Sequence, residues 1–214
     1  MERFDQILNL RSISERIDFI DAFNFSDSVI NEKKLISFIK QEIFATRNKW
    51  YKIRLIDLTT ELEITDDNLN SIYLQYIKGE SFYMKLTILD YINNTHSYYI
   101  KDQIDSTSVE ALLNNKYERL IVKIQATLTL ILLSPLKKIY YLNIIKELLL
   151  KSNDYRAHIR LYNFIMGDYI NIPIVYINDY IDITNKKDFS TSAAVTSTLK
   201  ELNTFLSSNR HTPF

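Results

Sequence analysis

Three histidines, His96, His158 and His211, are the side chains best suited to general acid–base catalysis or to metal binding. A metal pair on one helix face needs a second ligand about one turn away, and no histidine here is followed four residues later by histidine or glutamate. His158 is the first residue of the segment 158–163, which resembles the segments 52–57, 85–90 and 138–143. The other three segments begin with lysine, so this position favours a structural role for His158. The histidines therefore predict neither a metal site nor a catalytic base, and we expect no cofactor.

Motifs for other chemistry are also missing. The sequence contains no G-x-S-x-G, H-E-x-x-H or G-x-x-x-x-G-K. Its only glycines, Gly79 and Gly167, cannot form a glycine-rich phosphate loop. The carboxylates of Glu61 and Glu63 are two residues apart and lie on different faces of a helix, so they form no obvious acid–base pair. We expect a protein that is not an enzyme.

The acidic residues are distributed unevenly, although the 26 lysines and arginines balance the 26 aspartates and glutamates. No basic residue interrupts the segments 17–32, 55–77 and 161–185, whereas basic residues concentrate at 116–160. The carboxylates of these three segments are Asp18, Asp21, Asp27 and Glu32, then Asp57, Glu61, Glu63, Asp66 and Asp67, then Asp168, Asp179 and Asp182.

Two explanations fit these acidic segments. The first is that the carboxylates are solvated and match the dipoles of helix ends. The second is that they form an acidic surface for a basic protein partner, in which carboxylates steer association and tyrosines supply contact area. Under the second hypothesis, the partner-binding residues include Asp57, Glu61, Asp66, Asp67, Tyr176, Asp179, Tyr180 and Asp182.

Composition narrows the class of protein. Hydrophobic residues make up 46% of the 214 residues and charged residues 24%, which is typical of globular proteins. A chain with two glycines and three prolines lacks the turns of most all-β folds, and a neutral chain lacks the positive charge of nucleic-acid binders. The chain has no cysteine, no visible signal peptide, and no apolar stretch long enough to span a membrane. We therefore expect a cytoplasmic protein without nucleic-acid or membrane partners.

Apolar residues recur with helical periodicity over most of the chain, so we predict an all-α protein with more than about 60% helix. Thr65 is a candidate cap for the helix at 66–78. The alternation within 170–183 could suit a strand, but Pro173 disfavours a central one. The predicted helices form pairs at 27–45 and 48–63, 66–78 and 80–93, 117–133 and 135–151, and 154–166 and 172–182, with a last helix at 191–208.

Two of these helices have predicted core faces. The helix ending at Leu133 is apolar nearly all round, so it should be central, with Leu120, Ile124, Leu128, Ile131 and Leu132 nearly inaccessible. The helix that follows Pro135 should bury Leu136, Ile139, Tyr140, Ile144 and Leu148. Short connections imply antiparallel neighbours, so we expect stacked helical hairpins in a single domain over 1–214.

A basic-aliphatic pattern occurs at 52–57, 85–90, 138–143 and 158–163, with irregular spacing between the occurrences. Either amphipathic helices simply look alike, or these segments are degenerate solenoid repeats. With its paired helices, the chain over about 27–183 resembles the HEAT/armadillo-like superfamily. That resemblance implies an α-solenoid of stacked antiparallel helical hairpins, with the helix at about 191–208 after the repeats.

Two functional resemblances follow. HEAT-like DNA glycosylases use aromatic residues and a carboxylate, and Trp50, Tyr51 and Asp57 could imitate that set, although a neutral chain lacks their basic DNA track.

In size, helical class and charge pattern, the chain is similar to bacterial immunity proteins of contact-dependent growth inhibition and related polymorphic toxin systems. This similarity implies that it binds the C-terminal toxin domain of its cognate effector and blocks a nuclease, with EndoU-like ribonucleases as one candidate class. A generic HEAT-like interaction scaffold is the alternative.

Overall fold

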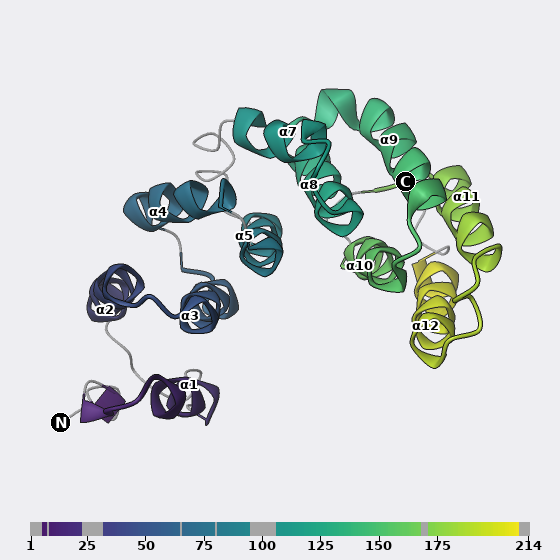
Figure 1. The fold of residues 1–214 in the computed structure, drawn as a ribbon. Coiled ribbons are helices and arrows are strands. Elements are labelled where there is room, and N and C mark those ends of the chain that lie inside the picture. The colour runs from purple at the N-terminus through teal and green to yellow at the C-terminus, as the bar shows by residue number, and fades with distance from the viewer. Residues whose placement is uncertain are drawn as a thin grey trace. The chain divides into compact units, whose positions relative to one another are not determined.

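The computed structural model of the chain describes residues 6–7, 9–22, 32–64, 66–79, 81–94, 106–167 and 171–209. Of these residues, 81% are helical, in eleven α-helices and short 3-10 turns, and none is in a strand. The predicted all-α class is confirmed. The chain divides into two compact units, residues 1–103 and 104–214 (Figure 1). The single domain expected over 1–214 stays a prediction.

Unit 1 is built around α3, which packs against α1, α2 and α5, while α4 packs against α5 (Figure 1). Leu55 and Ile56 of α3 and Ile88 and Leu89 of α5 are fully buried and form part of the core. The helices among the described residues of this unit are α1 (Ile13–Ala22), α2 (Glu32–Ala45), α3 (Lys49–Glu61), α4 (Asp67–Ile77) and α5 (Phe82–Asn94).

Side chains at the helix beginnings explain where α3 and α4 start. The Asn48 side chain accepts hydrogen bonds from the Trp50 and Tyr51 backbone N–H groups, which α3 itself leaves unsatisfied. Asp66 caps α4 by accepting from the Leu69 N–H at 2.9 Å. Asp66 therefore takes the role that the sequence predicted for Thr65, which lies outside the described residues.

Glu42 links three helices of unit 1. Its carboxylate is only 8% exposed and accepts from Arg16 of α1 and from the Tyr51 hydroxyl of α3, the latter at 3.1 Å. Burial and the neighbouring Glu42 charge raise the pKa of Tyr51, so the hydroxyl stays protonated and able to donate. A buried carboxylate needs such partners, because an unpaired charge in the core is strongly unfavourable.

Unit 2 is built around α8, which packs against α7, α9 and α10, while α9 packs against α11 and α10 against α12 (Figure 1). A 3-10 turn at Pro135–Lys137 joins α8 to α9. In the part of unit 2 that the structure describes, the helices are α7 (Ser106–Asn114), α8 (Leu120–Leu133), α9 (Lys138–Lys151), α10 (Tyr155–Met166), α11 (Ile174–Asn185) and α12 (Ala193–Asn209). The segment that could have alternated as a strand is thus helical from Ile174 onwards.

The prediction for α8 is confirmed in four of its five residues: Ile124, Leu128, Ile131 and Leu132 are buried. Leu120 is partly exposed because it is the first residue of the helix. No single helix in the described ranges is long and apolar enough to cross a membrane, and the one combination that passes, α8 with Pro135–Lys151, is bent by 120°.

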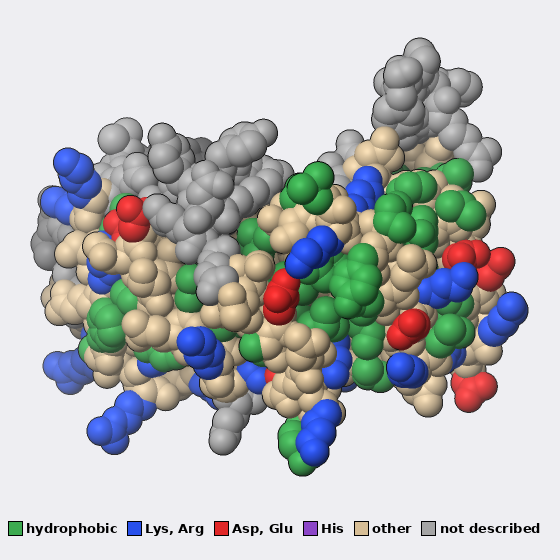
Figure 2. Space-filling model, turned by 90° about the horizontal axis from the view of Figure 1, so that it is seen from above, with side chains coloured by type: hydrophobic (Ala, Val, Ile, Leu, Met, Phe, Trp, Pro, Cys, Tyr) green, Lys and Arg blue, Asp and Glu red, His purple; other side chains and the backbone are tan. Residues whose placement is uncertain are grey.

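The predicted core face of α9 is wrong in its first turns. Leu136, Ile139 and Tyr140 are exposed, with exposed fractions of 103%, 54% and 62%. The helix instead buries a face that includes Tyr141 and Leu142. Figure 2 shows hydrophobic side chains gathered on this outer face of unit 2, over α9 and α11. Helix α9 is therefore apolar on two sides.

Neighbouring helices of each unit share a common register. Helices α3 and α5 have equal length and are offset by the same amount at both ends, so the segments 52–57 and 85–90 occupy equivalent positions on two packed helices. In unit 2, Lys138 of α9 bonds the Asn171 carbonyl oxygen and Lys146 pairs with Asp179 of α11, at an identical offset along the chain. The segments 138–143 and 158–163 lie on consecutive helices, α9 and α10, and are not equivalent in this way.

Candidate functional site

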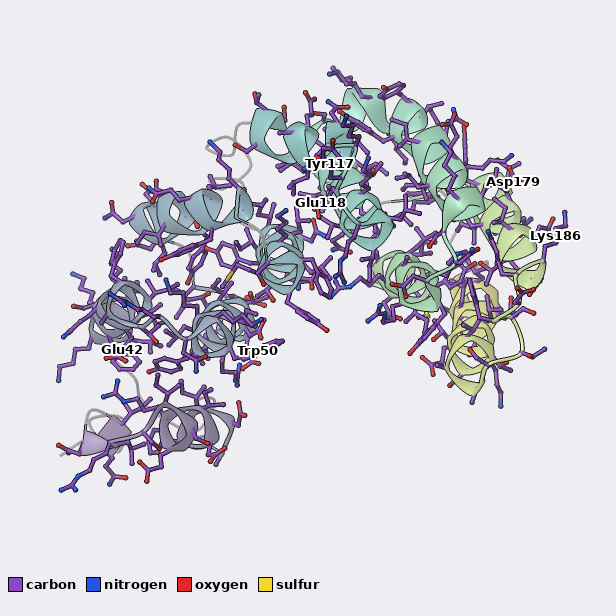
Figure 3. The ribbon with its side chains drawn as sticks, in the orientation of Figure 1. Glu42, Trp50, Tyr117, Glu118, Asp179 and Lys186 are labelled. Carbon is purple, nitrogen blue, oxygen red and sulfur yellow. The ribbon has the colours of Figure 1, made fainter. Side chains whose placement is uncertain are left out.

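One face of α3 carries the most chemically active side chains of unit 1. Trp50, Arg54, Asp57 and Glu61 are spaced by four, three and four residues, so they follow one another along one side of the helix. Tyr51, by contrast, is completely buried. Figure 3 shows Trp50 on the side of α3 that is turned away from α2. We call this side of α3, together with Asp21 of α1 and Tyr83 and Asp90 of α5, the α3 face.

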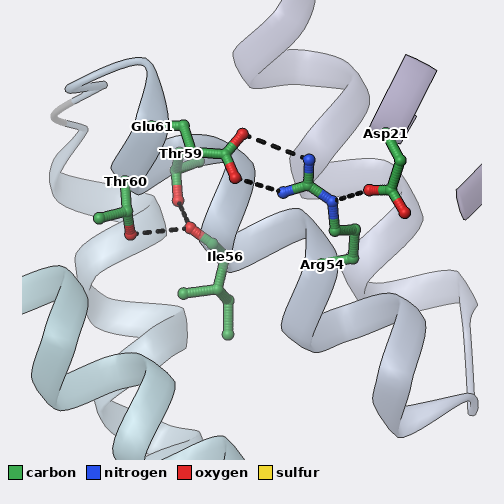
Figure 4. A network of polar contacts seen from close by, with 6 residues as sticks. All are labelled: Asp21, Arg54, Ile56, Thr59, Thr60 and Glu61. Atoms are coloured by element: carbon green, nitrogen blue, oxygen red, sulfur yellow. Dashed lines mark hydrogen bonds and ion pairs between the residues drawn. The ribbon is translucent and has the colours of Figure 1, made fainter. Parts of the chain in front are cut away.

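Arg54 is the centre of the polar contacts on the α3 face (Figure 4). Its Nη1 and Nη2 donate to the two carboxylate oxygens of Glu61 at 2.9 and 3.3 Å, and its Nε donates to Asp21 of α1. Arg54 itself is mostly covered, whereas the side chains of Asp21 and Glu61 are about half exposed, at 54% and 55%. The two carboxylates hold the guanidinium and still face solvent.

Asp57 adds negative charge to this arrangement. Burial raises the pKa of Asp57 from 3.8 to about 6; the Arg54 charge opposes that rise, and the charges of Glu61, Asp90 and Asp21 add to it. The charges of Arg54 and of three other carboxylates thus act on Asp57. We call Asp21, Asp57, Glu61 and Asp90 the carboxylate cluster.

We expect Asp57→Asn to stabilise the protein at pH 7 by about 1 kcal/mol, less than for a fully buried carboxyl because Asp57 keeps some contact with water. The folded-state pKa lies above the ordinary value, so the folded protein binds this proton more tightly and loses stability as pH rises from about 4 through about 6. Urea unfolding at pH 4 and pH 7 should show the gain of the variant only at pH 7. The matched control is Asp67→Asn at an exposed carboxylate, and an equal gain there would contradict this account.

An exposed aromatic pair lies at the other end of the α3 face. The rings of Trp50 and Tyr83 are 5.1 Å apart between centroids, and their residues are 48% and 42% exposed. Each is the second residue of its helix, so they occupy equivalent places in α3 and α5. Trp50 precedes Asp57 by two helical turns, which is about 10 Å along the helix. The α3 face therefore combines aromatic area with negative charge.

The carboxylates predicted on α4 are not bound to Arg54. Asp66 is engaged as the cap of α4 and pairs with Lys40 of α2, with a shortest N–O distance of 2.8 Å. The Lys40 hydrogen bond and the Leu69 N–H help to hold the pKa of Asp66 below its usual value, although burial opposes them. Asp67 is exposed in the first turn of α4.

The predicted residues of unit 2 all lie on α11, in differing surroundings. Asp179 pairs with Lys146 of α9 at 2.7 Å, Asp182 is exposed, and Tyr176 is partly buried. The prediction that Tyr180 faces a partner is wrong. This side chain is completely buried, and its hydroxyl donates to the Leu142 carbonyl oxygen at 2.8 Å, so it is a core residue between α11 and α9.

The premise that the acidic segments lack basic partners is also wrong for four residues. Asp21 and Glu61 pair with Arg54, Asp66 pairs with Lys40, and Asp179 pairs with Lys146; each of these cations lies outside the acidic segment of its partner. Helix packing brings these cations in from other turns or helices. Sequence reasoning also omitted Asp90, Tyr83 and the role of Arg54. The sequence does contain a signal for Asp90 and Tyr83. An aromatic residue stands at both 50 and 83 and an aspartate at both 57 and 90, so the two pairs have the same separation along the chain.

Other candidate chemistry is not assembled. Tyr51 is in the core while Trp50 is exposed, so the glycosylase-like set with Asp57 does not share one surface. His158 is fully buried, its Nδ1 lies 2.8 Å from the Thr184 hydroxyl, and burial lowers its pKa to about 4. Within the described ranges, no group of three or more histidine or acidic side chains could hold a metal ion.

Comparison with protein-family models gave no match, and comparisons with curated protein sequences and with solved structures gave none either.

Proposed function

We propose that this protein is a binding module that acts as an immunity protein: it binds the toxin domain of a contact-dependent growth inhibition system in the cytoplasm through the α3 face. The observation that carries the proposal is the carboxylate cluster around Arg54, with the Trp50–Tyr83 pair on the same face. A nuclease with a basic cleft, such as an EndoU-like ribonuclease, is the kind of partner that this chemistry fits. A scaffold for other basic proteins is the alternative.

The electrostatics support a basic partner. Ionised Asp57 is disfavoured by burial and by three neighbouring carboxylates, so an arriving lysine or arginine relieves that cost. Carboxylates that remain half exposed, such as Asp21 and Glu61, create the negative potential that speeds encounter with a basic surface. Negative charge on this face is therefore expected to act mainly on the association rate.

The aromatic pair supports a guanidinium-bearing partner in particular. Arginine stacks on aromatic faces and also forms paired hydrogen bonds with carboxylates, so one partner segment can use both parts of the α3 face. Tryptophan and tyrosine are enriched among the residues that dominate binding energy, because they bury a large area at little entropic cost. Trp50 is expected to act mainly on the lifetime of the complex.

The same proposal extends to the architecture. We infer that each unit is a stack of HEAT/armadillo-like hairpins, with α3 and α5 in one layer of unit 1. In unit 2, α8, α10 and α12 form one layer and α9 and α11 the other. The supporting observations are the packing of every second helix, α3 on α5, α8 on α10 on α12, and α9 on α11, together with the common register of α3 and α5. Helices that lie side by side in one layer form a continuous surface, and the α3 face is such a surface.

The test uses, as the candidate toxin, the C-terminal domain of the protein encoded directly upstream of this gene, and measures its binding kinetics with this chain at several salt concentrations. Neutralising Asp57, Glu61 and Asp90 together as Asn, Gln and Asn should slow association about tenfold at low salt, with a smaller effect at high salt because ions screen the charges. Trp50→Ala should speed dissociation about 30-fold, as expected for a central aromatic contact.

Matched controls lie elsewhere on the chain. Glu147, Asp188 and Glu201 are exposed carboxylates of unit 2, so neutralising them changes the net charge equally and should leave association nearly unchanged. Phe44→Ala removes an exposed aromatic residue of α2, 64% exposed, and should leave dissociation unchanged. Equal effects of test and control variants would rule out the α3 face as the binding surface. Release of a base from DNA by the purified chain would instead support the glycosylase-like alternative.

A further inference from the structure

The outer face of unit 2 carries an apolar patch that the proposed function does not use. Its members lie on the 3-10 turn and first turn of α9 and on the first turn of α11. They are Leu136, Ile139, Tyr140, Ile174 and Val175, with exposed fractions of 103%, 54%, 62%, 46% and 59%. We call them the α9–α11 patch. Figure 2 shows hydrophobic side chains concentrated over these two helices.

The patch is surplus to the folding of unit 2. Helix α9 already buries Tyr141, Leu142, Ile145 and Leu149 against its neighbours, so the outer face of α9 would ordinarily be polar. The Lys138–Asn171 and Lys146–Asp179 contacts hold α9 and α11 side by side in a fixed register, which brings their first turns together. Five large apolar side chains exposed to this degree present an area on the order of 500 Å², comparable to the largest patch on a typical monomer.

Two of the three lysines named around the patch are paired with carboxylates of the same unit. Lys137 lies 3.8 Å from Glu110 of α7, Lys146 pairs with Asp179, and Lys138 is held by the Asn171 carbonyl oxygen. The rim therefore offers both signs of charge, with one lysine in excess of the carboxylates, and has only a small net charge. A partner that meets it well has an apolar centre and a rim of mixed charge, and a second copy of the same face meets that description.

We infer that two copies of this chain associate through the α9–α11 patch around a two-fold axis, each patch covering the other. An interface of standard size buries about 800 Å² per partner, and the patch with its rim residues supplies an area of that order. In a two-fold interface the same residues meet from both sides, so the lysines of one rim can also pair with the carboxylates of the other. This association is independent of the α3 face and of the proposed function.

Sedimentation velocity of the full chain over about 1–200 µM tests the inference. We expect a concentration-dependent dimer, and we expect the double variant Leu136→Glu, Ile139→Glu to weaken dimerisation at least 100-fold, since it places four carboxylates in the apolar centre of the dimer. The matched control is Tyr117→Glu, at a side chain that is 84% exposed. Tyr117 lies just before the beginning of α8, whereas the patch follows the end of that helix, so the two sites are separated by the length of α8, about 20 Å. Circular dichroism of both variants should match the parent chain, because both sites are on the surface.

Cysteine cross-linking gives a second readout that does not depend on the charge change. The sequence has no cysteine, so Tyr140→Cys and Val175→Cys each introduce a single thiol. We expect a short bis-maleimide linker to join two copies through position 140 or 175 and to leave Tyr117→Cys monomeric. A chain that stays monomeric at 200 µM, or a dimer that persists in the double variant, overturns the inference. Monomers that bind anionic vesicles or the toxin domain through the patch overturn it as well.

Discussion

Tyr180→Ala is expected to lower the free energy of unfolding by about 3–5 kcal/mol, the range for removing a large aromatic side chain from a core. Tyr180 is completely buried, and its hydroxyl donates to the Leu142 carbonyl oxygen of α9. The truncation leaves a cavity between α9 and α11 and an acceptor without its donor, so both effects act in the same direction. Urea unfolding followed by circular dichroism measures the loss.

Two further variants separate the parts of this effect. Tyr180→Phe keeps the ring and removes only the hydroxyl, so it should cost about 1 kcal/mol. Tyr176→Ala, one turn earlier on the same helix and partly exposed, should cost clearly less than Tyr180→Ala. A loss below about 1 kcal/mol for Tyr180→Ala would show that this side chain is not part of the core, and would return it to the surface that the sequence predicted.

Leu128→Ala is expected to cost about 2–5 kcal/mol, because Leu128 is fully buried in the helix against which α7, α9 and α10 pack. The same urea titration measures it. Leu150→Ala is the matched control, since that leucine is 56% exposed on α9 and its truncation should fall within about 0.5 kcal/mol of zero. Equal losses for the two variants would mean that α8 is not the central helix of unit 2.

Helical class, the central position of α8 and most helix boundaries could be predicted from the sequence, because they depend on local periodicity and caps. The core face of α9 could not. Apolar residues cover two sides of that helix, and periodicity alone does not say which side the rest of the unit covers. The periodicity therefore predicts Leu136 and Tyr140 in the core, whereas the structure exposes both.

The charge pairs could be predicted even less well. Arg54 of α3 bonds Asp21 of α1, and Lys40 of α2 bonds Asp66 at the start of α4, so neither pair is visible as a local pattern. Tyrosine is equally ambiguous, because its ring suits a core and its hydroxyl suits a surface. Tyr180 looked like a surface anchor only because aspartates flank it, whereas its own side of α11 faces α9.

The equal register of α3 and α5 has a consequence for how such a chain can change length over evolutionary time. Helices α3 and α5 have the same length and are separated by the same number of residues at both ends. A recombination between equivalent codons of the two helices therefore adds or removes the whole segment from one helix to the other. The remaining side chains keep their positions around the helix. Trp50 and Tyr83, or Asp57 and Asp90, then stand in for one another. Such an exchange therefore lengthens or shortens the presented surface in whole steps and keeps the helical register on both sides of the junction.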